Sequence, residues 1–280
     1  MTADRDDTGP APSRLRRRLS AGFSMLWTIL RRRRPKGGDR LPPLYRIENL
    51  IGLTVLVVGL ALVFLDPEIM PLQRTISPEV ARFFRSITDV GDSAFILVPT
   101  GLFCLVILLL DWSRHAAGIR AGVNRAFLYS GYIFFSVAAS GLLVIVLKIL
   151  FGRARPRYFE SLGAYHFNLF TTGAGNASFP SGHATTVAAF CAALIILFPR
   201  WRLVIIAFGL LGAFSRVFVG AHYPSDVLLG IFIGTVFSHR TALWLARRRL
   251  GFRISPKGRL MATGLGWPLV AARKLVQNPR

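Results

Sequence analysis

Cysteine and acidic residues are scarce in this sequence. It holds 2 cysteines in 280 residues, and both Cys104 and Cys191 fall inside apolar runs, where we expect neither a structural disulfide nor a two-cysteine metal site. Only 13 acidic residues stand against 35 lysines and arginines, which gives a formal net charge of +22. We expect no cleavable signal peptide either, because the apolar stretch at residues 21–30 is short, lies between arginine clusters and lacks a small-residue cleavage site.

Apolar runs, in contrast, are abundant and decide the fold class. The composition is 52% hydrophobic, and residues 102–110 contain none of the polar positions that a surface helix shows every third or fourth residue. A soluble helical protein would have to hide every such run. Several runs fall short of the ~20 residues that cross a bilayer, but each has neutral neighbours that extend it. We therefore predict an all-α polytopic membrane protein, a bundle of six transmembrane helices at residues 50–65, 93–110, 127–147, 184–198, 203–219 and 227–237.

The excess positive charge lies mainly at the two ends of the chain. Of the 35 lysines and arginines, 12 precede Glu48 and 10 follow Ser238. Basic residues beside spans usually mark the cytoplasmic side and anionic lipid headgroups. No base-stacking aromatic pattern accompanies the arginines, so we predict no nucleic-acid partner. We predict a basic, disordered cytoplasmic tail at residues 1–46, a membrane domain at 47–246 and a basic cytoplasmic tail at 247–280, with anionic headgroups at both tails.

Three cations fall near the outer ends of the predicted spans, where the positive-inside rule disfavours them. Lys148 and Arg155 belong to the segment KILFGRARP, and Arg216 belongs to SRVFVGAHYPSD. A cation within the bilayer costs roughly 2.5 to 3.5 kcal/mol, and taken singly Lys148 and Arg216 each fit a residue that snorkels to the interface. A phosphate dianion would compensate all three charges, and arginine forks match its oxygens. We therefore predict that Lys148, Arg155 and Arg216 bind phosphate.

The segment PSGH at residues 180–183 adds a helix entrance beside these cations. The first N–H groups of a helix have no internal partner, and together with the helix dipole they bind phosphate readily. Ser181 can cap the helix, and Gly182 lets the backbone approach a ligand closely. We predict that Ser181 and Gly182 assist phosphate binding.

Two histidines complete a set of groups suited to phosphoryl transfer. His222 precedes Asp226 by four residues, which one helical turn brings within reach. A carboxylate that holds one ring nitrogen fixes the tautomer and leaves the other nitrogen to attack phosphorus, while His183 protonates the leaving group and later deprotonates water. Zinc bound by His183, His222 and Asp226 is the alternative. It lacks a third neutral ligand and would be repelled by three cations, so we predict no metal and no cofactor.

Other polar residues of the outer loop at 152–179 receive a plainer interpretation. Arg153, Arg157, Tyr165 and His166 are within reach of a substrate headgroup, but we interpret them as residues of a solvated loop. Two further histidines, His115 and His239, fall on a cytoplasmic loop and at the inner end of the last span, and we assign them no chemistry.

In their order, the three motifs resemble those of the type 2 phosphatidic acid phosphatase superfamily. That pattern is Lys, six residues, Arg-Pro; then Pro-Ser-Gly-His; then Ser-Arg, five residues, His, three residues, Asp. The resemblance covers residues 148–226 and implies a six-helix membrane core and metal-independent hydrolysis through a phosphohistidine. It implies His222 as nucleophile, Asp226 as its orienting residue and His183 as acid and base. It also implies phosphate binding by Lys148, Arg155 and Arg216, assisted by Ser181 and Gly182.

The expected function is therefore that of a lipid phosphatase in a bacterial inner membrane, with its site at the periplasmic face and both termini cytoplasmic. Lipid A phosphate, undecaprenyl pyrophosphate, phosphatidylglycerol phosphate and phosphatidic acid are all candidate substrates. The long outer loop offers room for a sugar headgroup and favours lipid A. A lipid phosphotransferase would use the same phosphohistidine. A non-catalytic lipid-phosphate binder or transporter is the alternative of another class, but it has no use for two histidines and an aspartate.

Overall fold

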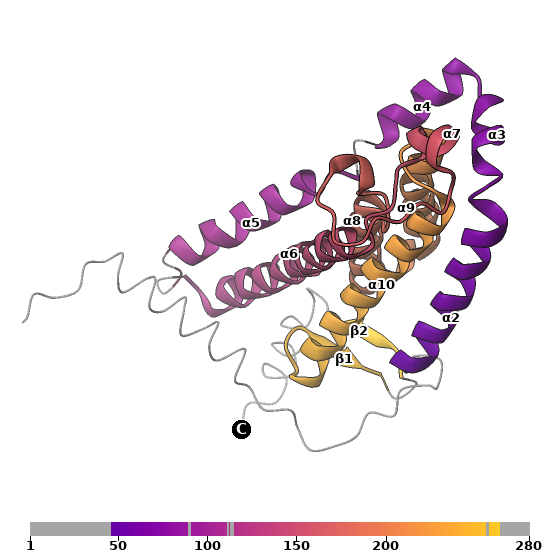
Figure 1. Ribbon diagram of the computed structural model, residues 1–280. Helices are drawn as coiled ribbons and strands as arrows, with labels where there is room; N and C mark the ends of the chain where they lie inside the picture. Colours follow the sequence, from indigo (N-terminus) through magenta and orange to yellow (C-terminus); the bar gives the residue numbers. More distant parts are fainter. Residues whose placement is uncertain (1–45, 89–90, 111, 113–114, 256–257, 264–280) are drawn as a thin grey trace, which may run out of the picture.

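Each of the six predicted apolar runs falls on a helix of the computed structural model (Figure 1). The structure describes residues 46–88, 91–110, 112, 115–255 and 258–263. The predicted tail at 1–46 therefore lies almost wholly outside the described residues. The helices on which the runs fall are α2 (Ile47–Leu60) with the π-helical segment Ala61–Leu65, α5 (Ala94–Leu109), α6 (Ala117–Phe151), α8 (Gly182–Leu197), α9 (Arg202–Phe218) and α10 (Pro224–Arg247).

Among the residues that the structure describes, four helical stretches are long and apolar enough to cross a membrane: Ile47–Leu65, Ala117–Phe151, Pro199–Phe218 and Pro224–Arg247. Helices α5 and α8 are apolar but have 16 residues each. At 1.5 Å per residue such a helix reaches about 24 Å, which is less than the ~30 Å of the hydrocarbon core. The chain is a multi-pass membrane protein, and the count of six spans stays a prediction.

Apolar side chains cover the outer surface of the helices. Leu203 is 73% exposed, Phe95 68% and Val55 67%, and similar residues follow one another along α2, α5 and α9. A soluble monomer rarely exposes apolar patches of this extent. This surface therefore faces lipid.

Helices α8 and α10 approach each other very closely. A Cβ atom on Gly234 would lie 2.3 Å from the carbonyl oxygen of Thr185, and one on Gly230 would lie 2.6 Å from that of Ser181. Small residues let helix backbones meet in this way inside membranes. The contact brings the first turn of α8 beside the first turn of α10, where the Ser181 amide donates to the Asp226 carbonyl at 3.0 Å.

A short helix, α4 (Pro78–Thr88), lies on α9 at the outer end of the bundle (Figure 1). It begins with Pro78 in its first turn, and Ser77 Oγ accepts from the Val80 amide at 3.4 Å. The Phe84 ring stacks on Phe218 of α9, with centroids 4.2 Å apart. A further short helix, α3 (Ile69–Arg74), precedes it.

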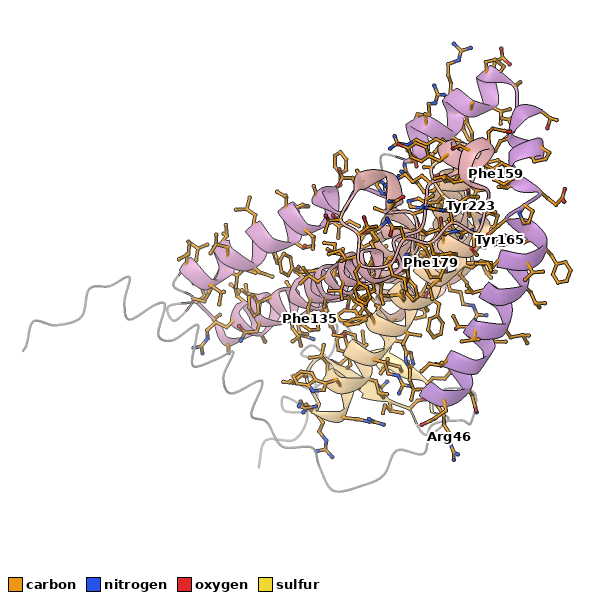
Figure 2. All side chains as sticks on the ribbon, in the orientation of Figure 1. Arg46, Phe135, Phe159, Tyr165, Phe179 and Tyr223 are labelled. Carbon is orange, nitrogen blue, oxygen red and sulfur yellow. The ribbon has the colours of Figure 1, made fainter. Side chains whose placement is uncertain are left out.

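The outer loop between α6 and α8 is folded back on the helix ends. Gly152 ends α6 in the left-handed conformation (φ +56°), and a Cβ there would lie 1.7 Å from the Asn168 carbonyl oxygen. The loop contains 3₁₀ turns at Pro156–Tyr158 and Ala174–Asn176 and the short helix α7 (Phe159–Leu162). Figure 2 shows Phe159 and Tyr165 of this loop beside Tyr223, at the end of the bundle far from Arg46.

At the opposite end, strands β1 (Phe252–Ile254) and β2 (Leu260–Ala262) form an antiparallel hairpin that packs on α10. Phe252 is buried and meets the Tyr132 ring of α6 edge-on, with centroids 5.0 Å apart. Helix α6 has 35 residues and begins about ten residues before the predicted run. Its contact with the hairpin is made by Tyr129 and Tyr132, which lie inside that run.

The α8–α10 contact predicts the effect of a single added methyl group. Gly234→Ala forces its Cβ against the Thr185 carbonyl and the Ala189 amide, so we expect a loss of about 1–3 kcal/mol of stability from overpacking. The measurement is the thermal unfolding midpoint in detergent. Gly59→Ala is the matched control, because a Cβ at Gly59 meets nothing within 4 Å. Equal midpoints for the two variants would contradict the close contact.

Candidate active site

The first two motifs meet where α6 ends and α8 begins. Lys148, one turn before the end of α6, donates from Nζ to the Ala177 carbonyl oxygen just ahead of the PSGH segment. A Cβ on Gly182 would lie 3.9 Å from Lys148 Cε, so the lysine chain passes beside the entrance of α8. Ser181 caps α8 as predicted, with its Oγ accepting from the Ala184 amide at 3.4 Å.

The third motif turns from α9 into α10. Gly220 adopts φ +71° in this turn, and His222 follows it after one residue. Asp226 stands at the third position of α10 and accepts from the Tyr223 amide at 2.9 Å, which closes the first turn of the helix. The local sequence thereby folds His222 and Asp226 onto one side of the turn.

His222 is 2% exposed, and its Nδ1 lies 3.4 Å from Asp226 Oδ2. This contact falls just outside hydrogen-bond geometry, and within the described residues Nδ1 has no other hydrogen-bond partner. Such bonds are often long without substrate and tighten when it binds. Burial lowers the pKa of His222 to about 4, Asp226 opposes the change, and the charges of Lys148 and Arg155 add to it. The ring is therefore neutral at pH 7, as a nucleophile must be.

The Asp226 carboxylate is fully buried and held from several sides. Its Oδ1 accepts from Arg153 Nη1 at 2.7 Å, and its Oδ2 accepts from Ser178 Oγ at 2.6 Å as well as from the Tyr223 amide. Three donors on one carboxylate favour its ionised form. The oxygen that faces His222 is thus fixed in direction.

Neutral oxygen atoms orient the three predicted phosphate-binding cations. Arg155 Nε donates to the Ala174 carbonyl oxygen at 3.1 Å, and Arg216 Nη1 donates to Thr88 Oγ1 at 3.0 Å. Lys148 interacts electrostatically with both arginines and with Asp226. Burial lowers the pKa of Arg155, and the neighbouring Arg157 charge adds to this, but an arginine keeps its proton at neutral pH. Together these side chains concentrate positive charge at one point.

His183 occupies the first turn of α8 and lies within the influence of the same three cations. The charges of Arg216, Lys148 and Arg155 all act on it, as those of Lys148 and Arg155 act on His222. Gly91 lies against its ring, since a Cβ there would be 3.0 Å from His183 Cδ2. The structure therefore gathers the eight predicted site residues at one end of the bundle: Lys148, Arg155, Ser181, Gly182, His183, Arg216, His222 and Asp226.

The interpretation of Arg153 as a solvated loop residue is wrong. Its side chain is completely buried and bound to Asp226, because the left-handed turn at Gly152 directs the chain back into the bundle. Arg157 and Tyr165 are exposed, as expected of a solvated loop. Sequence reasoning also missed Ser178 and Thr88, which contact Asp226 and Arg216. The one signal available in the sequence was the position of Arg153 on the predicted outer side of the membrane, where the charge rule disfavours an arginine.

Metal ligands are not gathered here. Among the residues that the structure describes, no group of three or more His, Cys, Asp or Glu side chains is arranged to hold a metal ion.

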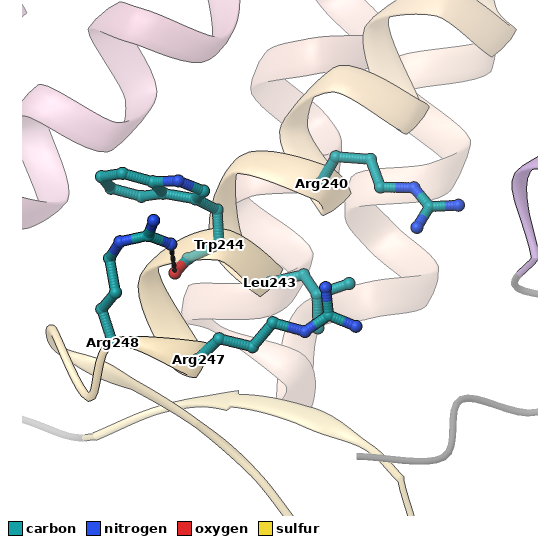
Figure 3. A pocket seen from close by; sticks show the side chains of 5 residues that line it. All are labelled: Arg240, Leu243, Trp244, Arg247 and Arg248. Atoms are coloured by element: carbon teal, nitrogen blue, oxygen red, sulfur yellow. Dashed lines mark hydrogen bonds between the residues drawn. The ribbon is translucent and has the colours of Figure 1, made fainter. Parts of the chain in front are cut away.

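A separate pocket of about 320 Å³ lies at the other end of α10 (Figure 3). The pocket is lined by Arg240, Leu243, Trp244, Arg247 and Arg248. The Arg248 guanidinium lies 3.8 Å from the centroid of the Trp244 indole ring. At 1.5 Å per residue, Arg240 is about 21 Å along the helix from Asp226. This pocket is therefore not part of the predicted active site.

Comparison with known proteins places the chain in a family. A family model described as the PAP2 superfamily matches residues 129–250, which contain all three motifs. A lipid A 1-phosphatase from Rhizobium johnstonii is 37% identical over 250 residues, which are 87% of this chain and 95% of that protein. The chain belongs to the PAP2 superfamily. The resemblance to type 2 phosphatidic acid phosphatases is thereby confirmed.

Two further PAP2 relatives differ in how much of their length they share. A lipid A 1-phosphatase from Rhizobium etli is 37% identical over 235 residues, which are 82% of this chain and 94% of that protein. The undecaprenyl-diphosphatase BcrC from Bacillus subtilis is 47% identical over 70 residues, which are 23% of this chain and 35% of that protein.

The burial of His222 predicts that acid destabilises this PAP2 protein. Its pKa falls from 6.5 to about 4 on folding, so the unfolded chain binds a proton between these values that the folded chain does not. The stability that neutral His222 contributes is fully present above pH 6.5 and is lost as the pH falls toward 4, by on the order of 3 kcal/mol.

Thermal unfolding of wild type and His222→Asn in detergent, at pH 7 and pH 4.5, tests this effect. The variant cannot take up the proton and should lose less stability than wild type on acidification. His115→Asn changes an exposed histidine and should behave as wild type. An equal loss in wild type and His222→Asn would rule out the effect.

Proposed function

We propose that this protein is a lipid phosphatase that removes the 1-phosphate of lipid A through a phosphohistidine intermediate. The length of the shared sequence supports this substrate. Similarity to the two lipid A 1-phosphatases extends over 94–95% of their chains, whereas similarity to BcrC extends over 35% of that protein. The long outer loop beside the site supports the same substrate, because a lipid with a sugar headgroup needs room there. Its acyl chains stay in the bilayer.

Phosphate binding would use the concentrated positive charge. Lys148, Arg155 and Arg216 would neutralise the dianion, and the first amides of α8, which begins at Gly182, would donate to its oxygens. Ser181 keeps this helix entrance capped. The charges are already in place before substrate binds, so little reorganisation opposes the transition state.

Chemistry would then proceed in two balanced steps. His222 Nδ1 faces Asp226, so the other ring nitrogen, Nε2, attacks phosphorus. The N–P bond forms as the P–O bond to the sugar breaks, and His183 gives its proton to the leaving oxygen. In the second step His183 takes a proton from water, the water oxygen attacks phosphorus and the N–P bond breaks. Asp226 stabilises the imidazolium that exists between the steps.

We also propose the membrane arrangement expected from the charges. Six helices cross a bacterial inner membrane, the membrane domain extends over residues 47–246, the site opens to the periplasm and both termini are cytoplasmic. The pocket of Arg240, Trp244 and Arg247 then lies at the cytoplasmic interface. Arginine and tryptophan suit an anionic lipid headgroup at this depth.

Loss of the nucleophile should abolish turnover. His222→Ala should lower phosphate release from lipid A in detergent by at least about 10³-fold, because no other group forms the covalent bond. His115→Ala, which changes an exposed histidine, should keep wild-type activity. Undecaprenyl pyrophosphate, phosphatidylglycerol phosphate and phosphatidic acid complete the panel. Faster wild-type turnover of any of these than of lipid A would replace the proposed substrate, and full activity of His222→Ala would remove the mechanism.

Chelation and vanadate test the absence of a metal from the reaction. We expect activity to be unchanged after EDTA treatment, because three cations supply the charge that a metal would otherwise supply. Vanadate, which resembles five-coordinate phosphorus, should inhibit. Activity that EDTA abolishes and zinc restores would show that the reaction depends on a metal. Label from a radioactive phosphate donor should appear in inorganic phosphate, whereas label in a second lipid would indicate a phosphotransferase.

A further inference from the structure

Arg153 uses every one of its donors inside the protein. A guanidinium has five N–H groups. Nε and Nη2 donate to the Ala164 carbonyl oxygen at 3.2 and 2.7 Å, Nη2 also donates to Asp66 Oδ2 at 2.8 Å, and Nη1 donates to Ser225 Oγ and Asp226 Oδ1 at 2.8 and 2.7 Å. The side chain is 0% exposed. Arg153 is therefore occupied within the fold and has no donor left for a substrate phosphate.

Its two carboxylate partners come from distant parts of the chain. Asp66 directly follows the π-helical end of the first apolar stretch, outside the segment that the PAP2 model matches, and Asp226 belongs to the first turn of α10. Both carboxylates are 0% exposed. Asp66 also holds Ser225, whose amide donates to Oδ1 at 3.0 Å and whose hydroxyl donates to Oδ2 at 2.5 Å. Asp66 thus reaches the start of α10 both directly and through Arg153.

The contacts fix which oxygen of Asp226 faces His222. Arg153 holds Oδ1, whereas Ser178, the Tyr223 amide and His222 Nδ1 all lie at Oδ2. The Arg153 guanidinium also lies 4.0 Å from the centre of the Tyr223 ring, next to His222 in the chain. Rotation of the Asp226 carboxylate would break the bond to Arg153, so the arginine locks the direction in which Asp226 meets the histidine.

The charges of Asp66, Arg153 and Asp226 also support a role for this cluster in the function of His222. Burial raises the pKa of Asp66, and its contacts with Arg153 and Ser225 oppose that change. When both carboxylates are ionised, the guanidinium between them leaves one net negative charge beside His222, which stabilises the imidazolium form of the histidine. If Asp66 were neutral, Arg153 would cancel the charge of Asp226 at the moment the histidine becomes positive. Buried ion pairs add little to stability compared with apolar side chains of the same volume. Stability alone therefore gives little reason for this arrangement.

We propose that Asp66 and Arg153 are positioning residues that act through Asp226 to orient His222 and to stabilise its positive charge. This inference rests on the proposed function of His222 as nucleophile. Neither residue touches the phosphate. Their removal should therefore lower kcat and leave KM, which depends on the three phosphate-binding cations, nearly unchanged.

A double-mutant cycle tests whether the two residues act through Asp226. Asp66→Asn and Arg153→Lys should each lower kcat for phosphate release about 10- to 100-fold, the range typical of groups that orient a catalytic ligand, with KM within about twofold. In an Asp226→Asn background the same changes should have little further effect, because the carboxylate through which they act is already gone. If Asp66→Asn or Arg153→Lys lowers kcat by the same factor in the Asp226→Asn background as in wild type, the proposal is overturned.

Glu68→Gln is the matched control, because it removes an exposed carboxylate two residues from Asp66. It should keep wild-type kcat and KM. Arg153→Lys keeps one positive charge but lacks the planar guanidinium, with five N–H donors, that contacts Asp66, Asp226, Ser225 and Ala164 at the same time. If it does not fold, Asp66→Asn carries the test alone, and failure of both variants to fold would assign the contacts to stability and overturn the proposal.

A second measurement does not need turnover. In protein labelled with ¹⁵N-histidine, the ring nitrogen shifts report which nitrogen of His222 carries the proton, with His222→Asn identifying the signal. Wild type should carry it on Nδ1, facing Asp226, and Asp66→Asn should shift the population toward the Nε2 form. An unchanged tautomer would contradict the positioning role. Absence of phosphate release from every lipid would instead contradict the proposed function, and the tautomer would still be measured.

Discussion

The close packing of α8 on α10 is the constraint on which the rest of the structure depends. Two glycines of α10 remove the side chains that would keep the helices apart, and the amide of Ser181 then reaches the carbonyl of Asp226. His183 and Asp226 both belong to the first turns of these helices. Their separation is therefore set by helix packing and not by a loop, and groups mounted on rigid elements are held more closely than groups on loops.

The cations near this contact fall into two groups according to the groups that accept their hydrogen bonds. Lys148 and Arg155 donate to backbone carbonyls, and Arg216 donates to a threonine hydroxyl, so these bonds orient the side chains without cancelling their charge. Arg153, in contrast, forms ion pairs with two buried carboxylates, Asp66 and Asp226. These four cations lie at the same end of the bundle, and what distinguishes Arg153 from the other three is the identity of the groups that accept its hydrogen bonds.

Much of the fold follows from local pattern. Apolar runs alone located the helices to within a residue or two at several ends. Helix α6 was underestimated because its first ten residues are less apolar yet still helical. The positions of the helices do not by themselves establish six membrane spans, because α5 and α8 are shorter than the hydrocarbon core is thick.

The site residues, too, could be predicted where they are close in sequence and could not be predicted where they are distant. Motif spacing identified His222 and Asp226, which are four residues apart and close through one helical turn. It could not identify Asp66, Ser178 or Thr88, because their contacts join residues 159, 48 and 128 positions apart. Ordinary residue types at such separations leave no periodic signal. Arg153 was misread for a related reason: the turn at Gly152 decides whether it points outward or inward, and charge alone does not encode that turn.

The bond between Asp66 and Ser225 ties the first apolar helix to the last, across 159 residues. During synthesis the ribosome releases α2 long before α10 exists, so Asp66 waits in the growing chain without this partner. Only an almost completely translated and inserted polypeptide closes the link. Truncated products and stalled insertion intermediates therefore lack it, and its formation marks the end of assembly in the bilayer.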